Sequence, residues 1–134
     1  MMDRSLSVLV VDDSRTMCAI ISQIVKKIGF TDVDAVYTGL DALSKLKQKT
    51  YGLIIVDWEM SPINGPELIG QIRNDKSLST AVIVLTTANH QWVAEMLKSR
   101  RTTGADIHIL KPFTADALTA KLVALVPETE IVQI

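Results

Sequence analysis

The stretch YGLIIVDWEM, residues 51–60, contains an apolar run that ends abruptly in the carboxylate of Asp57. The four apolar residues 53–56 are typical of a strand that is buried on both faces, as the strands of parallel sheets are. A buried charge is costly unless nearby groups compensate it. The elements around this strand must therefore supply both a parallel sheet and a partner for the carboxylate.

Short runs rich in Val, Ile and Leu alternate along the chain with longer segments of helical period, which indicates βα units. Crossovers in such units are right-handed and place helices on both faces of the sheet. The sequence therefore predicts an α/β fold with three layers, α/β/α, around a five-stranded parallel sheet. The expected strands are residues 6–11, 32–37, 53–56, 81–85 and 107–110.

Apolar side chains spaced by three and four residues predict helices between and after these strands. Ser14 is suited to cap the first helix, Gly29 to end it, and Pro66 to begin the third. A fourth helix is expected around residues 92–99 and a fifth from about Thr114. The expected inward-facing side chains are Met17, Ile20, Ile21, Ile24, Val25, Ile28, Leu40, Leu43, Leu46, Leu68, Ile69, Ile72, Val93, Met96, Leu97, Leu118, Leu122 and Leu125.

The length of 134 residues and the 48% hydrophobic content fit one domain, residues 1–134, with a core of about 6–126 and a C-terminal tail of 127–134. The formal net charge is -1 and basic residues cluster only at 98–101, so direct binding to nucleic acid is not expected. The N-terminal MMDRSLS precedes a very short apolar run, so we expect neither a signal peptide nor a membrane span. With a single cysteine, Cys18, the chain is expected to be cytoplasmic.

Polar side chains follow four of the five expected strands, at the ends that meet at one edge of a parallel sheet. Three carboxylates at that edge repel one another unless a cation compensates them, and Mg²⁺ is a hard ion that prefers oxygen ligands. A lysine and a threonine hydroxyl suit phosphoryl oxygens. The set predicts a phosphoryl-transfer site in which a carboxylate is the nucleophile. Its members are Asp12 and Asp13 after the first strand, Asp57 after the third, Thr86 at the end of the fourth and Lys111 after the fifth.

Taken singly, these residues have ordinary structural interpretations. An acid after a strand, such as Asp12 or Asp57, is commonly a solvated loop residue or a helix cap. Thr86 alone fits the end of any strand. The interpretation as a site therefore depends on polar groups recurring at the same end of four strands.

The motifs VLVVDDS, TGLDAL, LIIVDWEM, NGPEL, VLTTA and HILKPF resemble, as a set, the receiver domain of two-component response regulators. The resemblance covers essentially the whole chain, and it is strongest for receivers of the single-domain, chemotaxis type. It implies a flavodoxin-like sheet with strand order 2-1-3-4-5. It also implies that Asp57 is the phosphoacceptor and that Mg²⁺ is bound by Asp12, Asp13, Asp57 and the backbone carbonyl of Glu59.

The same resemblance assigns the remaining site residues. Thr86 matches the switch hydroxyl, and Lys111 matches the lysine that contacts the phosphoryl group. The bond between Lys111 and Pro112 is expected to be cis. His108 stands where receivers usually carry Tyr or Phe; it either reports the state of Thr86 or is a partly exposed strand residue with no switching role.

Glu59 lies two residues after the phosphoacceptor, at a position that varies within the family. A negative charge there borders the route of the attacking water, so one hypothesis is that Glu59 tunes the lifetime of the phosphate. The alternative is a solvated side chain. Two other departures are a proline shifted by one position, at Pro62, and a spacing between Thr86 and Lys111 that exceeds the usual one by a few residues.

The resemblance implies a stand-alone response regulator that catalyses its own phosphorylation and dephosphorylation and is not a conventional metabolic enzyme. Asp57 would take a phosphoryl group from a sensor histidine kinase or a phosphotransfer protein. Modification would switch a surface formed by the fourth helix, fifth strand and fifth helix, which would bind a downstream protein or a second copy as a homodimer. Two alternatives stay open: a phosphorelay intermediate that passes the group to a histidine phosphotransfer protein, and a receiver-like adaptor that is not phosphorylated.

Overall fold

The computed structural model describes residues 3–78, 80–92, 94 and 103–124. The strands are β1 (Val8–Val11), β2 (Val33–Val36), β3 (Leu53–Asp57), β4 (Val82–Thr87) and β5 (Ile107–Leu110). The helices are α1 (Arg15–Ile28), α2 (Gly39–Gln48), α3 (Gly65–Asn74) and α5 (Ala115–Val123). Most of the helix expected around residues 92–99 lies outside the described residues.

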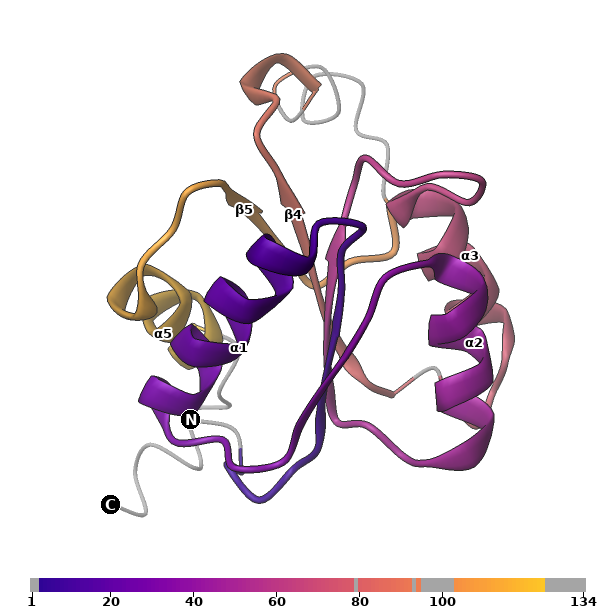
Figure 1. Ribbon diagram of the computed structural model, residues 1–134, viewed down its shortest axis with the longest axis horizontal. Coiled ribbons are helices and arrows are strands. Elements are labelled where there is room, and N and C mark those ends of the chain that lie inside the picture. Colours follow the sequence, from indigo (N-terminus) through magenta and orange to yellow (C-terminus); the bar gives the residue numbers. More distant parts are fainter. Residues whose placement is uncertain (1–2, 79, 93, 95–102, 125–134) are drawn as a thin grey trace.

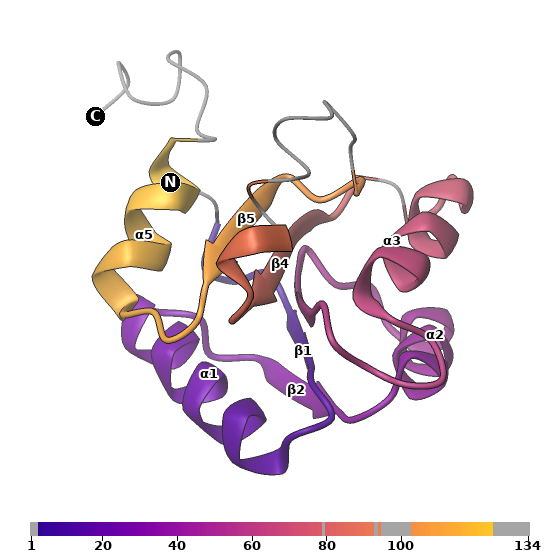
Figure 2. The same cartoon turned by 90° about the horizontal axis from the view of Figure 1, so that it is seen from above.

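The five strands form one parallel sheet in the order β2-β1-β3-β4-β5, which confirms the predicted fold. Figure 1 shows α1 and α5 on one face of the sheet and α2 and α3 on the other. Figure 2 looks down on the edge where the strands end. In the register of β3 with β4, Asp57 is the partner of Thr86, so the ends of these two neighbouring strands lie at the same height.

The core has two layers because side chains alternate between the faces of each strand. Leu9 and Ile54 pack with residues of α2 and α3, whereas Val10 and Ile55 pack with residues of α1 and α5. The four residues of β1 and the five of β3 are all buried, which explains why these strands read as continuous apolar runs. Each large aliphatic side chain removed from water contributes roughly 1.5–3 kcal/mol to stability.

Local signals at the helix ends agree with the sequence. The Ser14 hydroxyl accepts a hydrogen bond from the backbone N–H of Met17 at 3.1 Å, and α1 ends at Gly29 with a φ of 126°. At α3, Asn64 and Glu67 form a capping box, so the helix begins at Gly65 and Pro66 takes its second position.

The expected burial of Ile20 and Leu40 is wrong. Ile20 is 47% exposed and Leu40 is 58% exposed. The buried residues of α2 are Gly39, Ala42 and Leu46, and a Cβ on Gly39 would lie 3.2 Å from Ile63 in the loop after β3. Small residues allow a helix to approach its neighbours closely, and a pattern based only on large apolar residues misses this.

The edge strand β2 is held by a polar network at its N-terminal end. Lys49 Nζ lies 2.9 Å from Asp32 Oδ1 and 3.0 Å from Asp34 Oδ2. The Tyr51 hydroxyl donates a second hydrogen bond to Asp34, and the Ser7 hydroxyl donates to Asp32. The bond from Tyr51, and then that from Lys49, lowers the pKa of Asp34 below its ordinary value of 3.8.

Removing the Tyr51 hydroxyl should destabilise the domain in a pH-dependent way. Because the pKa of Asp34 is lowered in the folded state, its contribution to stability is present above pH 3.8 and is lost as the pH falls through the lowered value. We expect Tyr51→Phe to reduce the free energy of unfolding by about 1–2 kcal/mol at pH 7, and by less below pH 4. Urea denaturation across this pH range measures both effects.

Tyr37→Phe is the matched control, because the Tyr37 hydroxyl has no hydrogen-bond partner among the described residues. Its ring packs against the guanidinium of Arg15, 4.0 Å from the ring centroid, and this contact does not need the hydroxyl. The control should change stability by less than about 0.5 kcal/mol. Equal losses in the two variants would contradict the role given to the Tyr51 hydrogen bond.

Candidate functional site

Three carboxylates meet at the edge where the parallel strands end. Asp12 directly follows β1, and Asp57 is the last residue of the neighbouring β3. One carboxylate oxygen from each of Asp12, Asp13 and Asp57 lies within 4.8 Å of the others. Asp12 and Asp57 are buried, whereas Asp13 is exposed. The structure therefore brings together the three acids that the sequence predicted.

Lys111 closes the acidic cluster from β5. Its Nζ lies 2.9 Å from Asp12 Oδ2 and 2.9 Å from Asp57 Oδ1. The backbone N–H of Lys111 donates to the carbonyl of Thr87 at 2.8 Å, and the bond to Pro112 is cis. Burial lowers the pKa of Lys111, but the two carboxylates outweigh it and raise that pKa above its ordinary value. The ammonium is therefore charged at neutral pH, and it joins the ends of β1, β3 and β5.

The environment of Asp57 disfavours its charge. Burial raises the pKa of Asp57, the hydrogen bond from Lys111 lowers it, and the charge of Asp12 raises it again, to about 6. One lysine therefore does not fully compensate this carboxylate. A further cation at this edge would favour the ionised form, which is the nucleophilic one.

The donor set fits a magnesium ion. Carboxylate oxygens are ligands that Mg²⁺ prefers, and the exposure of Asp13 leaves room for the waters that the ion retains. Asp12 is held in place from two sides, because its Oδ1 accepts from the backbone N–H of Ser14 at 2.9 Å and its Oδ2 accepts from Lys111. Asp12, Asp13 and Asp57 are therefore the side chains that would hold the metal.

Thr86 and Thr87 have different partners. Thr86 is fully buried, and its hydroxyl donates to the carbonyl of Val56 at 3.5 Å, within the sheet. The Thr87 hydroxyl donates to Glu59 Oε1 at 2.7 Å and accepts from the N–H of Asn89 at 3.0 Å. Sequence reasoning singled out Thr86 and missed Thr87. The available signal was the presence of two consecutive threonines. Consecutive strand residues face opposite sides of the sheet, so Thr87 shares a face with Leu85 and Thr86 does not, and both had to be considered.

His108 lies on the face opposite to Thr86. In the pairing of β4 with β5, His108 is the partner of Leu85 and Ile109 is the partner of Thr86. The His108 ring Nε2 is 2.9 Å from the Thr103 hydroxyl. Burial, and then the charge of Lys121, lowers the pKa of His108. The structure therefore does not bring His108 and Thr86 together. Thr87 follows Leu85, the partner of His108, by two residues in β4 and so lies on the same face as His108.

The family model of the response regulator receiver domain matches residues 8–123 of the chain. The chain belongs to this family. The chemotaxis protein CheY-3 of Vibrio cholerae is 31% identical over 121 residues, which is 90% of this chain and 92% of that protein. CheY of Pseudomonas aeruginosa is 28% identical over 117 residues, 87% of this chain and 93% of that protein.

Solved structures of receiver domains agree with the fold. The response regulator TrrA of Thermotoga maritima, solved with Mg²⁺ and BeF, has a TM-score of 0.75 and 30% identity, covering 90% of this chain and 99% of that one. CheY4 of Vibrio cholerae has a TM-score of 0.77 at 24% identity, covering 90% and 98% of the two chains. Receiver domains act in two-component systems and bind Mg²⁺ at an acidic pocket, which corresponds here to the Asp cluster.

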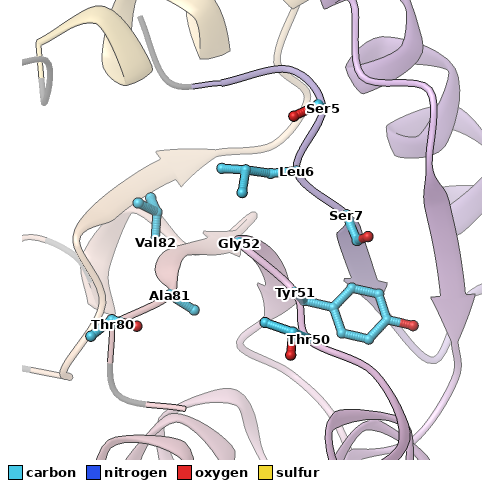
Figure 3. A pocket seen from close by; sticks show the side chains of 9 residues that line it. All are labelled: Ser5, Leu6, Ser7, Thr50, Tyr51, Gly52, Thr80, Ala81 and Val82. Atoms are coloured by element: carbon cyan, nitrogen blue, oxygen red, sulfur yellow. The ribbon is translucent and has the colours of Figure 1, made fainter. Parts of the chain in front are cut away.

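A hollow lies at the edge of the sheet opposite to the acidic cluster. It has a volume of about 450 Å³ and is lined by segments that lead into β1, β3 and β4, including Leu6, Tyr51 and Val82 (Figure 3). No Asp, Glu, Lys, Arg or His is among the described residues that line it. It therefore offers none of the charged groups found around Asp57.

Among the described residues, no helix is long and apolar enough to cross a membrane.

The thiol of Cys18 lies beneath the acidic cluster and should be unreactive. It donates to the backbone carbonyls of Asp12 at 3.3 Å and Val36 at 3.7 Å. Burial, and then the charge of Asp12, raises the pKa of Cys18 to about 11. We expect iodoacetamide at pH 8 to label the folded protein at least about 100-fold more slowly than the urea-unfolded protein. Mass spectrometry of the alkylated chain measures the rates, and similar rates would show that this thiol is accessible.

Proposed function

We propose that this receiver domain is a phosphorylation switch in which Asp57 accepts a phosphoryl group from the phosphohistidine of a sensor histidine kinase. The observation that carries the proposal is the position of Lys111, which bridges Asp12 and Asp57 beside a third carboxylate. This arrangement combines a nucleophile, a set of metal ligands and a fixed positive charge. A structural ion pair alone would not need three acids.

In the proposed reaction an oxygen of Asp57 attacks the phosphorus while the bond from phosphorus to the donor nitrogen breaks. The imidazole leaves, and an acyl phosphate forms on Asp57. The Lys111 ammonium, which contacts Asp57 directly, offsets charge on the transferred group. A bound Mg²⁺ would supply further stabilisation of that charge, held by Asp12, Asp13, Asp57 and the backbone carbonyl of Glu59. Water later cleaves the acyl phosphate and restores the carboxylate.

The output of this chemistry is a change in conformation. A phosphoryl oxygen favours a state in which a threonine hydroxyl moves toward it, and this shifts an existing equilibrium between two surfaces. The resemblance assigned this role to Thr86. Its hydroxyl is bonded within the sheet, however, so the contacts favour Thr87, which reaches a side chain of the loop after β3 and shares a face with His108.

The proposed binding surface combines β5 and α5 with the fourth helix, most of which lies outside the described residues. Val123 is 41% exposed in α5 and supplies an apolar contact. A downstream protein or a second copy would bind there. The complete set of Asp57, Lys111 and the acidic pair disfavours an adaptor that is not phosphorylated. A phosphorelay intermediate is distinguished by transfer from Asp57 to a purified histidine phosphotransfer protein.

Acetyl phosphate with Mg²⁺ should add one phosphoryl group to the protein, and Asp57→Asn should abolish this addition. Removing the metal with EDTA should prevent it as well, since the acidic edge then lacks its compensating charge. Lys111→Met should slow the reaction on the order of 100- to 1000-fold, because a preorganised charge at the transferred group is lost. Intact-protein mass spectrometry over time measures all three effects. Phosphate uptake by Asp57→Asn would contradict the assignment of the acceptor.

Thr87→Val and Thr86→Val separate the two candidate switch residues, since each removes one hydroxyl at nearly constant volume. We expect Thr87→Val to suppress the change in tryptophan emission that acetyl phosphate and Mg²⁺ produce, and Thr86→Val to retain most of it. Trp58, next to Asp57, reports the site directly, and its emission should also respond to Mg²⁺ alone. The reverse result would return the switch role to Thr86.

A further inference from the structure

The Thr87 hydroxyl is occupied on both sides. Thr87 is only 1% exposed, so its hydroxyl has little access to water. It accepts from the backbone N–H of Asn89 at 3.0 Å and donates its proton to Glu59 Oε1 at 2.7 Å. A hydroxyl has one proton to donate. While the Thr87 hydroxyl donates to Glu59, it cannot donate a hydrogen bond to a phosphoryl oxygen on Asp57.

The Glu59–Thr87 hydrogen bond belongs to a closed set of contacts between two loops. Asn89, whose N–H donates to Thr87, also accepts from the N–H of Trp92 at 3.1 Å. The ring of Trp92 lies 5.6 Å from that of Trp58 at an interplanar angle of 41°. Trp58 precedes Glu59 in the chain, so the contacts return to their starting point. The segment after β4, seen from above in Figure 2, is thereby tied to the loop after β3.

The charge of Glu59 acts in the same direction as its hydrogen bond. Its carboxylate is among the groups that raise the pKa of Asp57, after burial and the charge of Asp12. A phosphoryl group on Asp57 would add negative charge near a second carboxylate, and like charges at short range repel. The phosphorylated state therefore favours displacement of the Glu59 side chain from this position.

We infer that Glu59 is a positioning residue that latches Thr87, by its hydrogen bond, in the unphosphorylated conformation. After phosphorylation, a phosphoryl oxygen on Asp57 replaces Glu59 as the acceptor of the hydrogen bond that the Thr87 hydroxyl donates. The second half of this inference rests on the proposed function, whereas the latch itself is a property of the unphosphorylated protein. Because the N–H of Asn89 donates to the same hydroxyl, movement of Thr87 toward the phosphoryl group also displaces Asn89 and, through it, the contact between Trp92 and Trp58. The same side chain thus links the acidic site to the segment that follows β4.

A double-mutant cycle tests the latch without any phosphorylation. Glu59→Ala, Thr87→Val and the double variant are compared with the parent by urea unfolding. The two single changes should be coupled by a factor on the order of ten in the unfolding equilibrium constant, as expected for a hydrogen bond to a charged group. Glu59→Ala combined with Thr86→Val is the matched control and should be additive. Additivity in the Thr87 cycle would overturn the latch.

Tryptophan emission then distinguishes a latch from a merely structural contact. In unphosphorylated Glu59→Ala, the emission of Trp58 and Trp92 should shift toward that of the phosphorylated parent, and acetyl phosphate should modify Asp57 several-fold faster. Glu59→Gln keeps an acceptor oxygen for Thr87 and should show a smaller shift. Parent-like emission in Glu59→Ala would overturn the latch. If the parent itself takes up no phosphate, the proposed function fails, while coupling and the emission shift of the unphosphorylated variant would still support the latch.

Discussion

The ion pairs of Lys111 with Asp12 and Asp57 are the interaction on which the rest of the site depends. They join the ends of the neighbouring strands β1 and β3 to the end of β5, which lies at the edge of the sheet beyond β4. Both carboxylates are buried, and removing one partner of a buried ion pair typically costs about 3–5 kcal/mol because the other charge is left uncompensated. Removing this lysine alone would therefore destabilise the fold, and its charge also prepares Asp57 for a negatively charged substrate.

The burial of the apolar strands β1 and β3 determines the environment of Asp57. Because β1 and β3 are buried along their whole length, Asp57 has few routes to water and its pKa is raised to about 6. Among the described residues, the positive charge that compensates Asp57 directly is that of Lys111, which follows the end of β5. Hydrogen bonds among Glu59, Thr87 and Asn89 join the loop after β3 to the end of β4 and the segment that follows it.

Much of the fold could be predicted because burial imposes simple periods on the sequence. Five apolar runs with helical segments between them specified the layers, and acids after the first and third runs indicated the edge that could bind a metal. The prediction was wrong for Leu40, which is exposed in α2 between the buried small residues Gly39 and Ala42. The strand order itself came from the family resemblance, since periodicity does not determine which strands are neighbours.

The sequence by itself determined the elements, the parallel sheet and the acids Asp12, Asp13 and Asp57 as a group, because parallel strands end at a common edge. Only the tertiary structure decided which of two adjacent threonines faces Glu59. It also placed His108 on the face opposite to Thr86 and Lys111 between two particular carboxylates. These outcomes depend on strand register and side-chain direction, which pairing between distant segments sets and which local sequence does not encode.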